Sequence, residues 1–584
     1  MLSKLLMSVA SKLDRRFGWD KLPLPLGVLT LIGLRTRLRK ENLYDTGEGG
    51  AVAPPSDGRE RTERTVDGSW NDLSSPSMGM IGGRFGRNVP IARTFPDPLP
   101  QLLEPNPRLV SRELLTRDEF KPATIVNVLA AAWLQFEVHD WLSHGKSVPE
   151  EPFELELADD DPWPQRPMRI ERTRKDPSHT DDGTPPTYVT ADSHWWDGSQ
   201  IYGSDPNLAR ALRSGTDGKL RVDPDGQLPR DLDEHIDLKG VAGNFWLGLA
   251  LLHTLFTHEH NAICDRLKAE RPSWTDDELY AKARLINAAL MAKIHTVEWT
   301  PAIISHPTTQ YAMKANWWGV LGKTLGKRSH NEVLGGIPGS EVNHHGVPYS
   351  LTEEFVAVYR MHPLTPDDFT FRSIDDDRVL EERTFRELGA LDVRKRLDSL
   401  GLVDSFYSLG IAHPGAITLH NYPRFLQDFH KSDGTVVDLA ATDVLRIRER
   451  GVPRYNEFRR LFHMKPAETF EELTDNPEWA RQLQEVYDDV EHVDLMVGLY
   501  AEPLPKGFGF SDTAFRVFIL MASRRLKSDR FFTDDYNAET YTQAGLDWID
   551  DNTMVDVIKR HYPQLEPALR GVENAFQPWR RVTS

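Results

Sequence analysis

The sequence has 584 residues, a formal net charge of −18 and one cysteine, Cys264. A strongly acidic chain is a poor partner for nucleic acid, because phosphate binding depends on clustered Lys and Arg. A single cysteine excludes an internal disulfide and predicts a buried free thiol in a reducing compartment. With 39% hydrophobic and 9% aromatic residues, the chain can build a core large enough to enclose a cofactor.

Residues 1–45 are predicted to form amphipathic amino-terminal helices. Lys and Arg surround a helical repeat of apolar side chains, formed by Leu2, Leu5, Leu6, Val9 and Leu13. Such a segment either packs on the body of the protein or rests on a bilayer surface. No apolar run is long enough to span a membrane, and residues 22–34 contain prolines and lack a small-residue cleavage site. We therefore expect a cytoplasmic protein that is not secreted, with peripheral membrane contact left open.

Residues 46–584 are predicted to form one mainly α-helical domain with long surface loops. Gly, Pro, Ser and acidic residues without apolar periodicity predict loops over 47–80 and 158–190. Helical periodicity covers residues 125–145, 241–270, 276–298, 351–362, 380–408, 478–500 and 511–530, whereas β-branched alternation is scarce. We find no internal repeat, phosphate loop or paired-cysteine motif.

The first motif that carries chemistry is AAAWLQFEVHDWLSHG. Gln135 and His139 lie four residues apart on a predicted helix, so both side chains can point into one pocket. A histidine with a pKa near neutrality can take a proton from bound peroxide and return it to the leaving oxygen. A lone histidine on an apolar helix is more often structural, so the interpretation depends on the neighbouring motifs.

The second motif is EEFVAVYRMHPLTPDDF. Tyr359 and His362 are three residues apart on a predicted helix that ends near Pro363 and Pro366, which would place them side by side. A neutral histidine is a common axial ligand of haem iron, and a phenol beside it could be oxidised to a radical. The pair Tyr-x-x-His is weak evidence by itself.

Together these motifs resemble the fatty-acid α-dioxygenases, which are related to cyclooxygenases and animal haem peroxidases. The resemblance runs nearly end to end and includes RKENLYDTG, SHWWDGSQIYGSD, LLHTLFTHEHNAICDRL, AKIHTVEWTPAI, GVPRYNEFRR and ASRRLKSDRFFT. It implies a haem peroxidase and cyclooxygenase-like helical catalytic domain with one haem b per subunit. His139 would be the distal histidine, assisted by Gln135, and His362 the axial ligand. Tyr359 would form the radical, and Asn421 could orient the free ring nitrogen of His362.

The resemblance also implies a site for the substrate carboxylate. His295 and Thr300 in IHTVEWT and Arg525 in ASRRL would hold the acid beside the tyrosine, with Arg525 preferred to the adjacent Arg524. A planar guanidinium can bind both carboxylate oxygens. The alkyl chain would lie in an apolar channel lined partly by FRVFILM, although an ordinary core helix shows the same pattern.

A calcium site is the last implied feature. Its ligands would be Asp140, Ser193, the backbone carbonyl of Trp195, Asp197 and Ser199. Hard oxygen ligands of this kind suit Ca²⁺. The alternative is an Asp and Ser turn that binds no metal.

The implied reaction is α-oxygenation of a fatty acid. A peroxide activator would oxidise the haem, a Tyr359 radical would remove hydrogen from C2, and O2 would add to give a 2-hydroperoxy acid. That product can decarboxylate to an aldehyde one carbon shorter. We expect a monomer. Two alternatives remain, a haem peroxidase that oxidises small donors and a non-catalytic lipid-associated protein of the same fold. A cyclooxygenase is disfavoured because one cysteine cannot form its disulfide-rich module.

Overall fold

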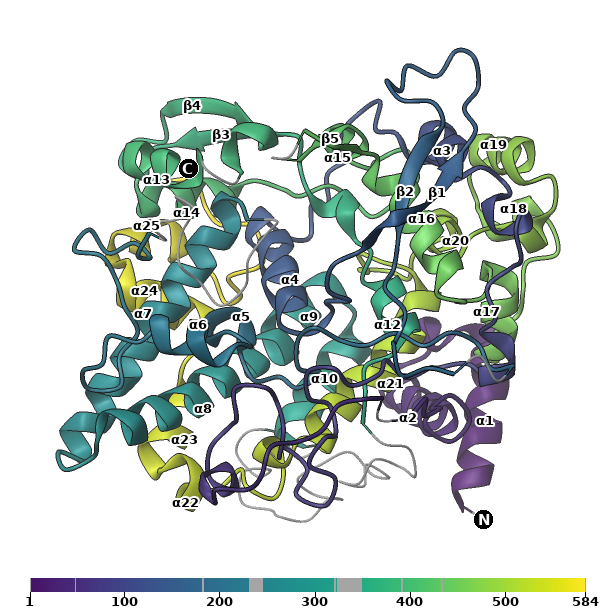
Figure 1. The fold of residues 1–584 in the computed structure, drawn as a ribbon. Helices are drawn as coiled ribbons and strands as arrows, with labels where there is room; N and C mark the ends of the chain where they lie inside the picture. Colours follow the sequence, from purple (N-terminus) through teal and green to yellow (C-terminus); the bar gives the residue numbers. More distant parts are fainter. Residues whose placement is uncertain are drawn as a thin grey trace.

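A computed structural model describes residues 2–582 except 48, 181–182, 231–244, 320–321, 323–348, 390–391 and 432–433. The mainly α-helical class is confirmed, since helices dominate and the strands form three small two-stranded sheets (Figure 1). Buried apolar side chains from Ala10 to Trp579 form one contiguous cluster. No described helix is long and apolar enough to cross a membrane.

The chain begins with two packed helices, α1 (Leu2–Phe17) and α2 (Leu24–Glu41). They approach closely at Gly33, where an added Cβ would lie 2.4 Å from the Cβ of Ala10. Asp14 of α1 also pairs with Arg516 at 3.0 Å, which ties the helix to the body. The outer face exposes Leu5, Val9 and Phe17. Packing on the body is therefore observed, while lipid contact stays a prediction.

The helices between residues 107 and 358 include several that carry site residues. Asn127 caps the helix Val128–Trp141, since its side chain accepts a hydrogen bond from the Ala130 amide. Thr275 and Glu278 form a capping box on the helix Asp276–Ile294. In chain order these are α3 (Pro107–Val110), α4 (Val128–Trp141), α5 (Ser199–Tyr202), α6 (Pro206–Ala211), α7 (Leu247–Glu270), α8 (Asp276–Ile294), the π-helical turn η6 (His295–Trp299), α9 (Thr300–Ile303), α10 (Pro307–Trp318) and α12 (Glu353–Val358). Among them, α4 packs against α5 and α7.

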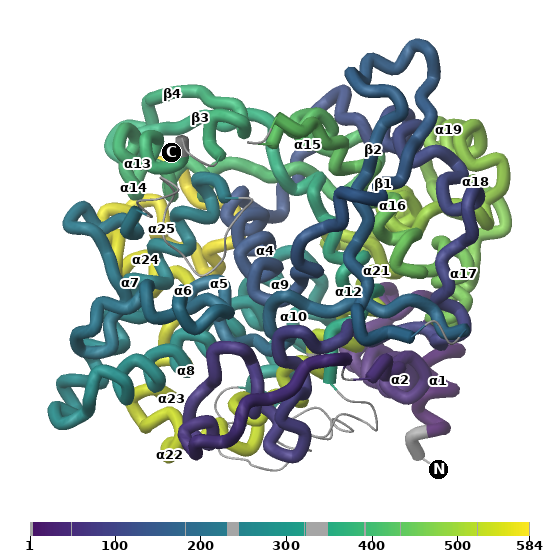
Figure 2. The backbone as a smooth tube through the Cα atoms, viewed as in Figure 1, coloured from purple at the N-terminus to yellow at the C-terminus, as the bar shows by residue number. Residues whose placement is uncertain are grey.

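The second half of the chain contributes a further set of helices. Its helices are α13 (Asp392–Leu400), α14 (Leu402–Ile411), α15 (Arg424–Gln427), α16 (Leu439–Glu449), α17 (Tyr455–Leu461), α18 (Phe470–Leu473), α19 (Pro477–Tyr487), α20 (Leu495–Ala501), α21 (Asp512–Ser528), α22 (Ala538–Tyr541), α23 (Gln543–Asp551), α24 (Met554–His561) and α25 (Glu566–Leu569). The chain starts at α1 and finishes on the opposite side of the molecule, where Arg581 pairs with Asp377 (Figure 2).

Three antiparallel hairpins complete the fold. They pair β1 (Val148–Leu155) with β2 (Met168–Arg172), β3 (Asp368–Arg372) with β4 (Val379–Thr384), and β5 (Phe429–His430) with β6 (Val436–Val437). The loop predicted over 158–190 therefore contains a strand. The helix predicted over 380–408 is wrong at its start, because residues 379–384 pair with β3. The start of the helix predicted over 241–270 lies outside the described residues.

Two other predicted helices are interrupted. The one over 478–500 is divided into α19 and α20 by a short 3-10 turn, Val490–His492. The one over 351–362 ends early, because α12 stops at Val358 and His362 starts a separate turn, η7 (His362–Leu364). Tyr359 caps α12 instead of lying inside it, so the expected helical spacing between Tyr359 and His362 is not kept.

Candidate active site

The helix α4 is almost wholly buried, but one of its faces is partly accessible. That face carries Gln135, Val138 and His139, which are three and four residues apart. The indole nitrogen of Trp246 donates a hydrogen bond to the side-chain oxygen of Gln135 at 2.8 Å. The structure thus places Gln135 and His139 on one face, as their spacing predicts, with space beside that face.

His362 is held by a carboxylate that the sequence did not single out. Its Nδ1 lies 2.7 Å from an oxygen of Asp443, and Arg360 lies 2.9 Å from the other oxygen. Tyr422 donates a hydrogen bond to Asp443 at 2.8 Å. Burial alone would raise the pKa of Asp443, but His362 and Arg360 outweigh burial and lower it. Asp443 is therefore an ionised, fixed partner for one ring nitrogen.

This arrangement corrects the role predicted for Asn421. The side-chain nitrogen of Asn421 donates to the carbonyls of Lys121 and Ala416, at 2.9 and 2.7 Å, and its oxygen accepts from Arg117 and the Lys121 amide. These bonds fix the loop before α15. The hydrogen bond expected between Asn421 and His362 is not formed, because Asp443 occupies that place.

The residues around His362 fit an axial haem ligand. Its Nδ1 faces Asp443, which leaves Nε2 for a metal, and 30% of the side chain is exposed while the neighbouring Met361, Pro363 and Leu364 are buried. A carboxylate on the other ring nitrogen orients a ligating histidine and raises its basicity. His362 is thus the residue that would hold the iron.

One pocket brings the predicted substrate residues together with Tyr359. His295, Thr300, Arg525 and Tyr359 all line it. The remaining wall is mostly apolar and comes from Trp196, Thr296, Met313, Asn316, Phe355, Phe518, Ala522 and Leu526. Phe518, Ala522 and Leu526 are spaced four residues apart and form one face of α21, which includes part of the FRVFILM segment. The site can therefore hold a polar head against an apolar wall.

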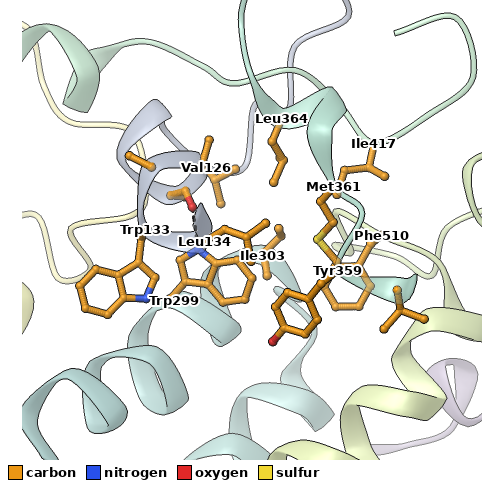
Figure 3. Packing of buried hydrophobic residues seen from close by; sticks show 14 of the residues in the cluster. Val126, Trp133, Leu134, Trp299, Ile303, Tyr359, Met361, Leu364, Ile417 and Phe510 are labelled. Carbon is orange, nitrogen blue, oxygen red and sulfur yellow. Dashed lines mark hydrogen bonds between the residues drawn. The ribbon is translucent and has the colours of Figure 1, made fainter. Parts of the chain in front are cut away.

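Tyr359 is fixed by aromatic packing. Its ring stacks on Phe518 with centroids 4.8 Å apart, and Phe355 and Trp141 lie 4.6 and 5.7 Å away. Figure 3 shows Tyr359 among the buried apolar side chains of the core, with Trp299 and Trp133 to its left in the view. Burial, as the largest influence, raises the pKa of this phenol, so it carries its proton in the resting protein.

A π-helical turn presents the carboxylate residues. The turn η6 follows α8 directly, and a π turn places residues five apart above one another, which aligns His295 with Thr300. The Thr300 hydroxyl donates to the His295 carbonyl at 2.8 Å. Trp133 donates its indole N–H to Nδ1 of His295 at 3.2 Å. Burial and then the charge of Arg525 lower the pKa of His295 well below its usual value, so the ring is neutral.

Arg525 lines the pocket, whereas the adjacent Arg524 does not. The guanidinium of Arg525 lies over the rings of Trp141 and Trp196, 3.8 and 4.3 Å from their centroids, and its Nε donates to the hydroxyl of Tyr349 at 3.3 Å. Its buried Nη2 makes no hydrogen bond within the described residues. A buried donor without a partner fits an anionic ligand in this pocket.

The five residues predicted to hold calcium include two linked carboxylates. Ser199 donates its hydroxyl to Asp140 at 2.8 Å, and Ser193 donates to Asp197 at 2.9 Å. Burial and then the charge of Asp197 raise the pKa of Asp140 to about 8. Arg284 lies 3.5 Å from Asp197. Because these two buried carboxylates repel one another, a bound cation would stabilise their charged forms.

Several residues of the site could not be picked out from the sequence. Asp443 lies on α16, whose buried positions also include Arg446, Arg448 and Glu449, so no local contrast marks it. Trp133, Trp141 and Trp196 surround His295, and Trp196 also donates to the buried Glu137 at 2.8 Å. Their role depends on contacts between distant segments, which no local pattern encodes.

The histidines of α7 belong to the structural core. His258 and His260 hydrogen-bond the carbonyls of Gly226 and Gly218, at 2.7 and 2.9 Å. No group of three or more His, Cys, Asp or Glu side chains suited to a metal occurs in the described part of the chain. Cys264 is buried and free, as predicted.

His260 gives the fold a pH dependence that can be measured. Burial, as the main cause, lowers its pKa to about 4, and the hydrogen bond to the Gly218 carbonyl opposes part of this shift. In the neutral ring one nitrogen accepts a hydrogen bond from Tyr202 and the other donates to Gly218. Below about pH 6.5 His260 is protonated in the unfolded chain, whereas in the folded protein it stays neutral until about pH 4. The contribution of neutral His260 to the free energy of unfolding is therefore complete above about pH 6.5 and is lost as the pH falls towards about 4.

We therefore expect the difference in unfolding free energy between wild type and His260→Gln to shrink by about 3 kcal/mol between neutral pH and pH 4. Urea titrations of both proteins across this range measure it. A difference that is independent of pH would contradict the assignment of a neutral His260.

Comparisons with known proteins agree with this geometry. The animal haem peroxidase family model matches residues 63–575. The α-dioxygenase PIOX of Oryza sativa is 39% identical over 97% of this chain and 94% of its own, and that of Pisum sativum is 39% identical over 99% and 92%.

A solved structure extends the match to three dimensions. The fatty-acid α-dioxygenase of Oryza sativa superposes with a TM-score of 0.92 at 38% identity, over 99% of this chain and 97% of the other. A Tyr→Phe variant of that enzyme, solved with palmitic acid, gives the same values. The family resemblance of the sequence is thus confirmed, and with it the haem-binding class. The chain belongs to the animal haem peroxidase family and, within it, to the fatty-acid α-dioxygenases.

Proposed function

We propose that this protein oxygenates fatty acids at C2 by means of a radical on Tyr359. The observation that carries the proposal is the pocket that Tyr359 shares with His295, Thr300 and Arg525. A carboxylate bound by these side chains sits next to the phenol, and the carbon nearest to a carboxylate is C2. The rice relative solved with palmitic acid supports a long-chain substrate.

Arg525 is the strongest anchor for the substrate head. It is buried, its guanidinium lies 3.8 and 4.3 Å from the ring centroids of Trp141 and Trp196, and its Nη2 is not used elsewhere in the described residues. Nε2 of His295 is a second donor. The Thr300 hydroxyl donates to the His295 carbonyl, so it can donate to a carboxylate only after its O–H rotates. The acid is therefore held mainly by Arg525 and His295.

The side chains of the site then act in a fixed order. His362 would hold one haem b per subunit, which would supply the oxidising power taken from peroxide, and His139, with Gln135 beside it, would move the peroxide proton to the leaving oxygen. Tyr359 gives up one electron and its proton. The resulting neutral radical takes a hydrogen atom from C2, O2 adds to the carbon radical, and the peroxyl group recovers a hydrogen atom from Tyr359. The phenoxyl radical is regenerated, and the product is a 2-hydroperoxy acid.

The product can react further without the protein. Loss of CO2 and water from the 2-hydroperoxy acid leaves an aldehyde one carbon shorter. The direct test is incubation of the haem-loaded protein with palmitate, peroxide and oxygen, followed by mass spectrometry for both products. With a small phenol added to a parallel incubation, a small-donor peroxidase would oxidise the phenol and leave palmitate unchanged, and a non-catalytic lipid-associated protein would oxidise neither.

Calcium at the loop around Asp197 is part of the proposal. The support is an oxygen-rich cluster in which Asp140 and Asp197 are buried and the Ser199 amide donates to both of them. Ser193 also donates to Asp197, and Arg284 lies 3.5 Å from the same carboxylate. Asp140 directly follows His139 on α4, so an ion here would hold the end of that helix.

Calcium is expected to raise the thermal midpoint of the protein. A ligand at 100 times its dissociation constant adds about 2.7 kcal/mol to the folded state. Calorimetry in Ca²⁺, in Mg²⁺ and after dialysis against a chelator measures the effect, with Asp197→Asn as the variant that should lose it. The same midpoint in all three conditions would mean that this turn binds no metal.

A further inference from the structure

His295 is surrounded by four tryptophans, two from α4, one from the loop before α5 and one from its own turn, η6. Its ring stacks on Trp299, with centroids 4.7 Å apart and an interplanar angle of 20°, and the edges of Trp196 and Trp141 lie 5.3 and 5.8 Å away. The fourth indole, Trp133 on α4, makes the only hydrogen bond to the ring within the described residues, from its Nε1 to Nδ1 at 3.2 Å. Both side chains are buried.

That hydrogen bond determines which ring nitrogen carries the proton. An indole N–H can only donate, so Nδ1 of His295 must accept and cannot hold a proton. The ring is then neutral, and its one proton is on Nε2. Its tryptophan neighbours offer no negative charge that would favour a second proton, and the nearby guanidinium of Arg525 opposes one.

The position of this proton matters because the pocket has few donors. The Thr300 hydroxyl already donates to the His295 carbonyl, and the Nε of Arg525 donates to Tyr349. An Nε2–H group can donate to a carboxylate oxygen. The opposite tautomer would turn a lone pair towards the same oxygen, which exchanges an attraction for a repulsion.

We propose that Trp133 is a positioning residue for substrate binding, which holds His295 in the tautomer whose Nε2–H donates to the fatty-acid carboxylate. The inference rests on the proposed function and deepens it, because it assigns the carboxylate site a residue that does not touch the substrate. It also links α4, the helix of His139, to the substrate pocket through one hydrogen bond.

The test is a double-mutant cycle on the haem-loaded protein with palmitate as the substrate. Trp133→Phe keeps an aromatic ring in the core and removes the donor together with part of the indole volume, a loss that Trp579→Phe reproduces elsewhere in the core. We expect the KM for palmitate to rise about 10-fold, the equivalent of ~1.4 kcal/mol, with kcat within about 2-fold. In a His295→Phe background the same change should alter KM by less than about 2-fold, because Trp133 then has nothing to orient.

Two further variants separate orientation from general damage. His295→Gln offers a carbonyl to Trp133 and an amide donor to the substrate, so it should bind palmitate better than His295→Phe, and only while Trp133 is present. Trp579→Phe removes another buried indole donor, whose partner is the carbonyl of Ala575 at 2.8 Å, and should leave KM unchanged.

Each outcome points to one conclusion. Additive effects of Trp133→Phe and His295→Phe on KM, or equal KM values for His295→Gln and His295→Phe, would overturn the role of Trp133. If His295→Phe itself leaves the palmitate KM unchanged, the proposed carboxylate site is wrong. The comparison of His295→Gln with His295→Phe does not require a Trp133 variant that folds.

Discussion

Replacement of Tyr359 by Phe is expected to reduce palmitate oxygenation by at least about 1000-fold, which corresponds to ~4 kcal/mol in the barrier. Once oxidised to the phenoxyl radical, Tyr359 is the group in the pocket that takes a hydrogen atom from C2, and Phe keeps the packing on Phe518 and Trp141 while it removes the oxygen. Oxygen uptake and mass spectrometry of the acid products measure the loss.

The same variant should keep its reaction with peroxide, because His139 and His362 are unchanged. Peroxide-driven oxidation of a small phenol by the Tyr359→Phe protein should stay within about 3-fold of wild type, that is, within ~0.6 kcal/mol. Tyr541→Phe is the matched control, since it removes a buried hydroxyl that only donates to the carbonyl of Phe531. Normal C2 oxygenation by the Tyr359 variant would show that another residue carries the radical.

Replacement of Arg525 by Leu is expected to weaken palmitate binding about 30-fold or more, because an unpaired buried carboxylate costs ~2–5 kcal/mol. The effect should fall on KM more than on the rate of haem oxidation by peroxide. Arg525→Lys should recover only part of the affinity, since an ammonium group keeps the charge and loses the planar fork that lies over Trp141 and Trp196.

The neighbouring arginine provides a demanding control. Arg524 is also buried on α21, but it does not line the pocket, and its guanidinium lies 6.0 Å from the ring of Tyr349. Arg524→Leu should therefore alter stability and leave the palmitate KM within about 3-fold, or ~0.6 kcal/mol. A larger effect of Arg524→Leu than of Arg525→Leu on the palmitate KM would mean that Arg524, and not Arg525, anchors the carboxylate.

The parts of the site that the sequence predicts well are those carried by local motifs. Gln135 and His139 share an accessible face because their spacing matches one helical turn, and that prediction needs only periodicity. His295, Thr300 and Arg525 were placed by family resemblance, and they line one pocket with Tyr359. The π turn that aligns His295 with Thr300 could not be expected from a pattern that reads as a regular helix.

The parts that the sequence misses depend on contacts between distant segments. Asp443 reaches His362 from a helix about eighty residues later in the chain, whereas Asn421 was chosen by analogy and is used by the backbone of Lys121 and Ala416. Strand pairing explains the wrong helix over 380–408 in the same way, because β4 exists only through its register with β3.

The position of oxygen insertion tests the central claim most directly. Haem-loaded protein incubated with palmitate, peroxide and 18O2 should give 2-hydroperoxypalmitate labelled at C2, together with the aldehyde shortened by one carbon, and Tyr359→Phe should give neither. Label at any other carbon of palmitate, or an equal yield of C2 product from the Tyr359 variant, would contradict a carboxylate held beside a radical-forming Tyr359.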